Sequence, residues 1–341
     1  MIDISNTSLA AARELPRQEL RKVRQAGKPG QQARWKQLRH GFYIQNRPDT
    51  SKHQCNQTVS LARIIAESAL NHDAVFTLES AALLHGYMIR DGVPPVCIAK
   101  HPNQNRHAHT YPAVSLGEFQ VPAATTQISS STTQFETMQI SGIPVLTPVD
   151  LICMMMRKRD PLTAMITVDH ACAELCAADP IRRQETETEF VKLQDSVRER
   201  LTEMRGQHGC KQALKLVELM TPWVQSPLET RFRLIAAAYG FPTPILQYEV
   251  FNEGSVFYVD AFFPQQRLAI ELDGLAKYNN DIDVLRKEKR RERHLLDQRM
   301  QIERFSFREL TRPAQIARTL GARIPDCSAT VPVHQFLLEN W

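Results

Sequence analysis

Three acidic residues on two expected β-strands are the residues best suited to chemistry in this chain. Asp260 interrupts an apolar run at residues 259–263, and Glu271 and Asp273 lie two positions apart at the end of the next strand. Because side chains alternate along a strand, Glu271 and Asp273 project from one face of the sheet. If the two strands pair as antiparallel neighbours, Asp260 approaches Glu271 closely enough to share a divalent cation.

A carboxylate on a buried strand is costly to desolvate unless it is paired or bound to a metal. Mg²⁺ or Mn²⁺ suits such a site, because these ions prefer oxygen ligands and combine carboxylates with waters and a substrate phosphate. Lys277 follows shortly after the acids and is placed to contact a scissile phosphate or to orient a water. The alternative is that the acids pair with arginines such as Arg231 or Arg291 and have no catalytic role.

The elements that must position these acids follow from apolar periodicity and turn residues. Ser226 and Pro227 are a helix-start signal, and the apolar stripe after them predicts a helix over residues 228–239. Turn residues and short apolar runs then predict strand, strand, strand, helix, strand and helix. These segments are residues 247–251, 256–263, 267–273, 282–298, 301–307 and 309–320.

This order of elements and its local motifs resemble the PD-(D/E)XK nuclease core. The closest resemblance is to an endonuclease-domain family related to the very-short-patch-repair endonuclease. The motifs are residues 226–231 (SPLETR), Pro242, Pro244, Gln247, residues 259–260 (VD), 271–274 (ELDG), 277–278 (KY) and 288–292 (EKRRE).

The resemblance implies a restriction-endonuclease-like α-β-β-β-α-β core over residues 226–321. It also implies that Asp260 and Glu271 are metal ligands and that Glu229 is a supporting acid. Where the wider superfamily usually has Lys, this chain has Asp273. Lys277 or Lys289 would then have to supply the positive charge.

Basic residues gather in two islands towards opposite ends of the chain. Residues 1–50 hold ten basic and four acidic residues, and residues 286–312 hold ten and five, within a net charge of +5. Clustered Lys and Arg favour a polyanion such as DNA, although solvated helix faces are the alternative. The predicted nucleic-acid contacts are Arg21, Lys22, Arg24, Lys36, Arg39, Lys289, Arg290 and Arg291.

The first segment, residues 1–52, has the pattern of a winged helix. Residues 17–25 predict a short helix that ends at a break rich in Gly and Pro, and residues 41–44 (GFYI) predict a strand that serves as the wing. In such a domain the helix enters the major groove of DNA.

Residues 53–180 predict an α+β domain, in which residues 114–121 and 137–146 are strands and residues 142–144 mark a turn. The motifs of this segment are residues 80–86 (SAALLHG), 142–145 (GIPV), 147–151 (TPVDL) and 168–171 (VDHA). Together with the winged helix, they resemble the AbiEi family of antitoxins and transcriptional regulators. The resemblance implies DNA binding and a partner protein of a toxin–antitoxin or phage-defence system.

Length and composition predict a folded multidomain protein of the α/β and α+β class, with 341 residues of which 43% are hydrophobic. The expected domains are 1–52 (winged-helix-like), 53–180 (AbiEi-like), 181–225 (helical connector), 226–321 (nuclease-like) and 322–341 (tail). We expect residues 1–221 to fold without the rest, because Ser226 begins a separately capped helix. Seven scattered cysteines and no leader-like or membrane-spanning apolar run predict a cytoplasmic location and no membrane partner.

Histidines near Asp91 are the other grouping with possible chemistry. His101, His107 and His109 lie around a proline loop without the ordered spacing of a metal site, so we expect them to be exposed to solvent. The whole sequence therefore predicts a DNA-binding, Mg²⁺-dependent endonuclease, a hydrolase of phosphodiester bonds. The alternative is a catalytically inactive DNA-binding regulator or an antitoxin-like protein.

Overall fold

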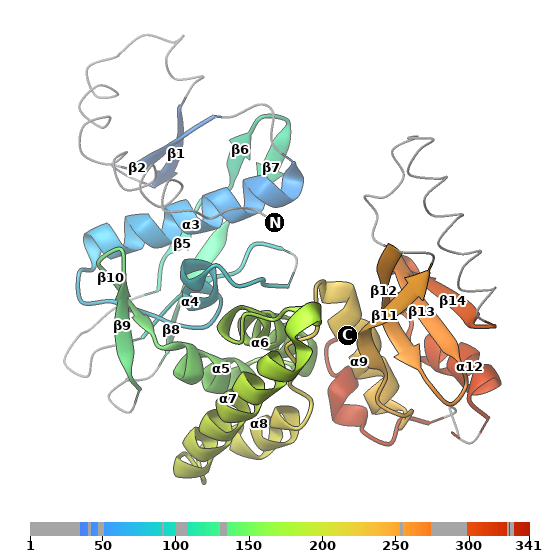
Figure 1. Cartoon of the computed structure of the whole chain (residues 1–341). Coiled ribbons are helices and arrows are strands. Elements are labelled where there is room, and N and C mark those ends of the chain that lie inside the picture. Colours follow the sequence, from blue (N-terminus) through green and yellow to red (C-terminus); the bar gives the residue numbers. More distant parts are fainter. Residues whose placement is uncertain are drawn as a thin grey trace. The chain divides into compact units, whose positions relative to one another are not determined.

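The computed structural model describes residues 35–39, 42–46, 51–90, 92–99, 108–129, 135–252, 255–273, 299–325, 327 and 331–341 (Figure 1). The chain forms two compact units, Met1–Met154 and Met155–Trp341. Both units combine helices with β-sheets, so the protein has a mixed α/β and α+β architecture. No helix among the described residues combines the length and apolar character that crossing a membrane requires.

The first unit contains two hairpins, a mixed six-stranded sheet and the long helix α3 (Lys52–Leu70). The hairpins are β1–β2 (Trp35–Arg39, Phe42–Gln45) and β6–β7 (Val114–Leu116, Phe119–Val121). The sheet has the order β5-β8-β4-β3-β10-β9. Its strands are β3 Val75–Phe76, β4 Val96–Ala99, β5 Thr110–Tyr111, β8 Ala124–Ser129, β9 Thr137–Ile140 and β10 Ile143–Leu146. Helix α4 spans Leu78–His85, and α5 (Pro148–Lys158) crosses from the first unit into the second.

Helix α3 begins at a capping box. Ser51 Oγ accepts a hydrogen bond from the N–H of Gln54 (3.3 Å), and Gln54 Oε1 accepts one from the N–H of Ser51 (3.0 Å). These two bonds satisfy donors that the first turn of a helix leaves without partners. The helix therefore starts at Lys52, and its buried face begins one turn later at Cys55.

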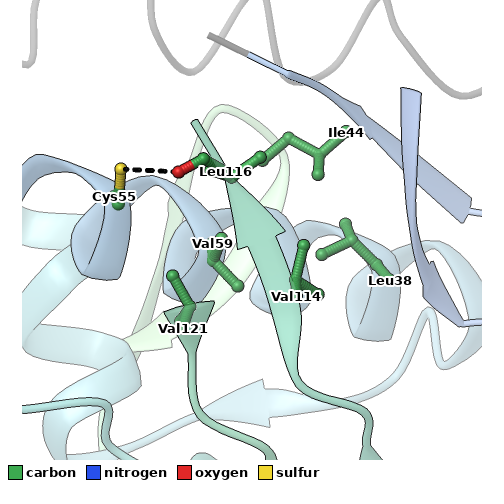
Figure 2. Close-up of a cluster of buried hydrophobic side chains, with 7 residues drawn as sticks. All are labelled: Leu38, Ile44, Cys55, Val59, Val114, Leu116 and Val121. Carbon is green, nitrogen blue, oxygen red and sulfur yellow. Dashed lines mark hydrogen bonds between the residues drawn. The ribbon is translucent and has the colours of Figure 1, made fainter. Parts of the chain in front are cut away.

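One apolar core joins helix α3 to both hairpins (Figure 2). The core consists of Leu38, Ile44, Cys55, Val59, Val114, Leu116 and Val121. In addition, the Cys55 thiol donates a hydrogen bond to the carbonyl of Leu116 (3.9 Å). An isolated two-stranded hairpin is at best marginally stable in water, so this shared core is what holds the two hairpins in place.

Arg63 of helix α3 fastens the base of the β6–β7 hairpin. Its side chain is fully buried, and Nη2 donates to the carbonyls of Pro112 (2.7 Å) and Pro122 (2.8 Å), which flank the hairpin. Burial lowers the pKa of Arg63 to about 10. The guanidinium is therefore still charged at neutral pH, and backbone carbonyl dipoles compensate part of its desolvation.

Two turns of the first unit differ from the sequence prediction. Residues 114–121, expected as one strand, reverse direction at Gly117, which has a φ of 55° that glycine adopts readily. The turn expected at residues 142–144 lies at Ser141 and Gly142, both with positive φ, and Pro144 belongs to β10. The strand predicted at residues 41–44 is β2, whereas the helix predicted at residues 17–25 lies outside the described residues.

The second unit contains a four-stranded sheet of order β11-β12-β13-β14. Strands β11 (Ile245–Asn252), β12 (Ser255–Phe263) and β13 (Leu268–Asp273) pair antiparallel, and β14 (Gln301–Ser306) runs parallel to β13. The helices are α6 Pro161–Leu175, α7 Arg183–Glu203, α8 Cys210–Val217, α9 Pro227–Ala238, α11 Phe307–Leu310 and α12 Pro313–Arg323. Short 3-10 turns span Pro180–Arg182 and Gln335–Leu338.

Helix α9 packs on the sheet through Phe232, whose ring lies 6.4 Å from that of Phe263 and 5.9 Å from that of Phe305. The helix and the four strands agree with the segments predicted over residues 228–273 and 301–307. The basic helix predicted over residues 282–298 lies outside the described residues.

A buried ion pair joins α6 to α9. Arg233 Nη2 donates to both carboxylate oxygens of Asp169 (2.7 and 2.5 Å), and Thr230 Oγ1 donates to Asp169 Oδ2 (2.8 Å). The boundary between the two units, at Met154 and Met155, falls inside α5, and both α6 and α9 belong to the second unit. Asp169 and Arg233 lie on opposite sides of residue 221, and independent folding of residues 1–221 stays a prediction.

We predict that Arg233→Met lowers the free energy of unfolding by about 3–5 kcal/mol, because it leaves Asp169 buried without its cation. The double variant Asp169→Leu/Arg233→Met should recover most of this loss, since it removes both charges together. Urea unfolding at pH 7, followed by tryptophan fluorescence and circular dichroism, measures both values. A single variant as stable as the parent would contradict this role of the ion pair.

Candidate active site

Glu229 lies in the first turn of α9, where the helix start fixes its position. Ser226 Oγ accepts a hydrogen bond from the N–H of Glu229 (3.4 Å), and Pro227 occupies the first helical position. The Glu229 side chain is only 3% exposed. Its Oε2 accepts from Gln247 Nε2 (3.0 Å) and from the N–H of Gln225 (3.1 Å). This buried carboxylate is thus held by neutral amide donors.

Gln247 of β11 connects this helix to the sheet. Its φ of 48° is in the left-handed region, and the β11–β12 pairing passes over it, from Leu246↔Ala261 to Tyr248↔Val259. A left-handed backbone is unfavourable for a residue other than glycine and persists where the surroundings enforce it. The irregular position lets the Gln247 amide reach Glu229, and the register places Gln247 next to Asp260.

Asp260 and Glu271 lie on the neighbouring strands β12 and β13. The antiparallel pairing ends at Ala261↔Ile270, and one further step in the same register sets Asp260 opposite Glu271. Asp260 Oδ2 accepts a hydrogen bond from the N–H of Leu272 (2.7 Å), which ties its carboxylate to β13. Glu271 is buried, with 8% exposure. Opposite residues of antiparallel strands share one face, as the sequence predicts for these two acids.

The charge of Asp260 on β12 affects the ionisation of Glu229 on α9. Burial, together with the negative charge of Asp260, raises the pKa of Glu229 from 4.5 to about 7. The hydrogen bonds from Gln225, Gln247 and Ser226 lower this pKa but do not offset the other two effects. Burial is the larger of the two effects, so Glu229 favours its neutral form here, and the negative charge of Asp260 adds to that preference.

The remaining predicted site residues differ in how far the structure describes them. Asp273 ends β13 in a half-buried position, and the parallel register sets it beside Ser306, while Glu271 lies beside Arg304. The predicted phosphate contact Lys277 lies outside the described residues. Arg231, which the sequence offered as an alternative partner for the acids, lies over the rings of Phe307 (5.6 Å) and Trp341 (5.1 Å).

The donor chemistry of Asp260 and Glu271 fits Mg²⁺ or Mn²⁺, which bind through one or two carboxylates and retain several waters. The negative charge of Asp260, which raises the pKa of Glu229, supports this fit. In the described ranges, no three side chains of His, Cys, Asp or Glu converge into a complete metal-binding group. A cation here would accordingly take two protein carboxylates and complete its coordination with water or a phosphate oxygen.

The predicted nucleic-acid contacts divide into two groups. Lys36 and Arg39 belong to β1, where Lys36 is half-buried and the Arg39 guanidinium contacts His109 (3.0 Å between Nη1 and Nε2). The others, namely Arg21, Lys22, Arg24, Lys289, Arg290 and Arg291, lie outside the described residues.

The sequence indicates no role for Gln247, although this residue is part of the motif set. The signal available was its position at the start of the predicted strand, residues 247–251, which does not predict a bond to Glu229, 18 residues earlier in the chain.

Comparison with known proteins gives a partial likeness. The chain is 30% identical over 87 residues to two uncharacterized proteins of Mycobacterium tuberculosis, MT2308 of strain CDC 1551 / Oshkosh and Rv2248 of strain ATCC 25618 / H37Rv. The match covers 25% of this chain and 32% of each relative, so it spans about a third of their length. No family model matches the chain, and no solved structure matches it significantly.

We predict that Glu229 makes the metal-free protein less stable as the pH rises. Because its folded-state pKa of about 7 exceeds the ordinary 4.5, the folded state binds more protons than the unfolded state between these values. The free energy of unfolding therefore falls through this window. Glu229→Gln should flatten the profile and gain up to about 3 kcal/mol over the parent at pH 8.

Urea unfolding in EDTA from pH 5 to 8 measures this difference. Glu303→Gln is the matched control, since Glu303 is an acid of β14 that pairs with the half-exposed Arg323 (2.6 Å). Parallel pH profiles for the parent and Glu229→Gln would show that Glu229 does not titrate in this range.

Proposed function

We propose that this protein is a DNA-binding endonuclease that hydrolyses phosphodiester bonds with Mg²⁺ or Mn²⁺. The observation that carries the proposal is the negative site formed by Glu229 and Asp260, beside the register that leads to Glu271. Acidic side chains gathered in a partly buried place are costly for stability and typical of functional sites. The order of α9, β11, β12, β13 and β14 supports the assignment of this part of the chain to a restriction-endonuclease-like core.

In this proposal Asp260 and Glu271 hold the cation, which supplies Lewis-acid polarisation and lowers the pKa of a bound water. Glu229 accepts two hydrogen bonds at Oε2, so the proton that it carries without a cation resides on Oε1. With a pKa of about 7, Glu229 can release or take up this proton at neutral pH. We assign Lys277 a contact with the scissile phosphate, and we place Asp273 at the edge of the proposed metal site.

DNA is the proposed substrate because of the two basic islands, residues 1–50 and 286–312. The β1–β2 hairpin supports a winged-helix arrangement, in which residues 17–25 would enter the major groove. The seven cysteines all lie within the described residues and form no disulfide, which supports our expectation of a cytoplasmic protein.

The main rival is an inactive DNA-binding regulator or antitoxin-like protein that acts with a protein partner. Asp273 favours this rival, because it stands where the wider superfamily has a lysine. Both functions require DNA binding, so metal-dependent cleavage is the property that distinguishes them.

We predict that Mg²⁺ raises the thermal midpoint of the parent and supports nicking of plasmid DNA. A cation present at 100 times its Kd stabilises the folded state by about 2.7 kcal/mol. Asp260→Asn and Glu271→Gln should each abolish both this gain and the cleavage. Each should also increase metal-free stability, because it removes one of the repelling charges.

Glu303→Gln is the matched control and should keep both the cleavage and the metal-dependent shift. Cleavage that survives in Asp260→Asn and Glu271→Gln would show that these acids are not the ligands. DNA binding without cleavage by the parent, in either Mg²⁺ or Mn²⁺, would favour the inactive regulator.

We predict that the first basic island contacts DNA phosphates. Reversing the charges of Arg21, Lys22 and Arg24 should weaken binding and flatten its salt dependence, with about 0.9 lost from the log–log slope for each phosphate contact. Binding titrations at several salt concentrations measure the slope. Reversal of Lys192 and Arg198, exposed bases of α7, is the control and should leave the slope unchanged. An unchanged slope in the first variant would exclude this segment from the interface.

A further inference from the structure

A second buried carboxylate, far from the candidate active site in sequence, lies in the first unit. Glu67 of α3 is 1% exposed. Tyr111 of β5 donates its hydroxyl to Glu67 Oε2 (2.7 Å), and the amide of Asn71 donates to Glu67 Oε1. Burial and the charge of Glu67 both raise the pKa of Tyr111, so the tyrosine keeps its proton and acts as a donor.

One imidazole nitrogen of His109 faces two different partners. His109 Nε2 lies 3.0 Å from Arg39 Nη1 and 3.1 Å from Glu67 Oε2. A guanidinium can only donate and a carboxylate can only accept. Nε2 therefore accepts from Arg39 when it carries a lone pair, and it donates to Glu67 when it carries a proton. We expected an exposed histidine here, but the His109 side chain is 30% exposed and lies against a buried acid.

A bulge in β1 aims Arg39 at this cluster. The pairing of β1 with β2 shifts by one residue between Gln37↔Tyr43 and Arg39↔Phe42. A regular strand would direct Leu38 and Arg39 to opposite faces, whereas a bulge re-aims a side chain. Leu38 accordingly enters the core next to α3 (Figure 2), while Arg39 Nη1 reaches to 3.6 Å from Glu67 Oε2 on the same helix.

We propose that His109 is a proton-operated latch for the β1–β2 hairpin. The neutral imidazole that carries its proton on Nδ1, beside Thr126 Oγ1 (3.2 Å), holds Arg39 against the cluster. The doubly protonated imidazole donates from Nε2 to Glu67 and releases Arg39. The exchange requires that Nε2 gain a proton, so lowering the pH drives the latch towards its open state.

The charges around His109 favour this exchange. In the described part of the chain, the charged and titratable groups near it are Glu67 and Arg63 of α3, Arg39 of β1 and Tyr111 of β5, and Thr126 Oγ1 of β8 lies 3.2 Å away. Arg63 donates to backbone carbonyls, so a protonated His109 and Arg39 would be two cations competing for Glu67. Arg39 is 29% exposed and can turn towards water, whereas Glu67 cannot.

Release of Arg39 loosens the hairpin without detaching it. Leu38 and Ile44 still bury their side chains against α3 and the β6–β7 hairpin. Hydrogen exchange resolves such local opening, since amides of a loosened element exchange while the rest of the fold stays protected.

The test is hydrogen exchange of the β1–β2 amides in the full-length parent at pH 8 and pH 5.5, corrected for the intrinsic effect of pH. The opening equilibrium at pH 5.5 should be on the order of tenfold larger than at pH 8, as expected for loss of a charge-assisted hydrogen bond. His109→Gln cannot be protonated and should show the same protection at both pH values. Arg39→Gln should show the loosened hairpin at both.

His53→Gln is the matched control, because His53 is an exposed histidine of the same helix α3, and it should keep the pH response of the parent. Circular dichroism confirms that each variant is folded. A parent hairpin with equal protection at both pH values would overturn the latch, and so would a His109→Gln variant that still responds to pH.

Discussion

Helix α9 carries three charged side chains that the fold withholds from water, and the partners of two of them determine how the second unit is assembled. Glu229 and Arg233 lie one helical turn apart, on the same side of the helix. The guanidinium of Arg233 pairs with the carboxylate of Asp169 on α6. The carboxylate of Glu229 accepts a hydrogen bond from Gln247 of β11. The burial of these charges thus connects α6 to the sheet through a single element, α9.

The charges of Glu229 and Arg233 are compensated in different ways inside the protein. The Asp169–Arg233 pair contains a permanent cation, so its charges cancel inside the protein and need nothing further. Glu229 has only neutral hydrogen-bond donors and lies near Asp260, and burial together with the charge of Asp260 leaves its pKa close to neutrality. A buried carboxylate without a bonded cation lowers the stability of the fold, so stability alone does not explain this arrangement. A proton or a cation that occupies the site during function would explain it.

The sequence predicts features that depend on neighbouring residues well, and it predicts contacts between residues far apart in the chain poorly. The cap at Ser226, the alternation that sets Glu271 and Asp273 on one face, and the strands around Asp260 all depend on residues close to one another in the chain. The ion pair of Asp169 with Arg233 joins residues 64 positions apart, and no periodicity encodes that distance. The division of the chain into units falls at Met154 and Met155, inside α5, a position that composition and capping residues do not indicate.

Three buried carboxylates show how the choice of partner sets the response to the surroundings. Asp169 is matched to an arginine that stays charged at physiological pH, and this pairing offsets part of the rise in the Asp169 pKa that complete burial causes. Glu67 is matched to Arg39 and to His109, whose ring nitrogen can either accept or donate a hydrogen bond. Glu229 has no matched cation among the contacts that hold it. The fold thus pairs one acid with a permanent cation, gives one a partner that can either accept or donate, and leaves one with neutral donors, although a desolvation cost applies to all three.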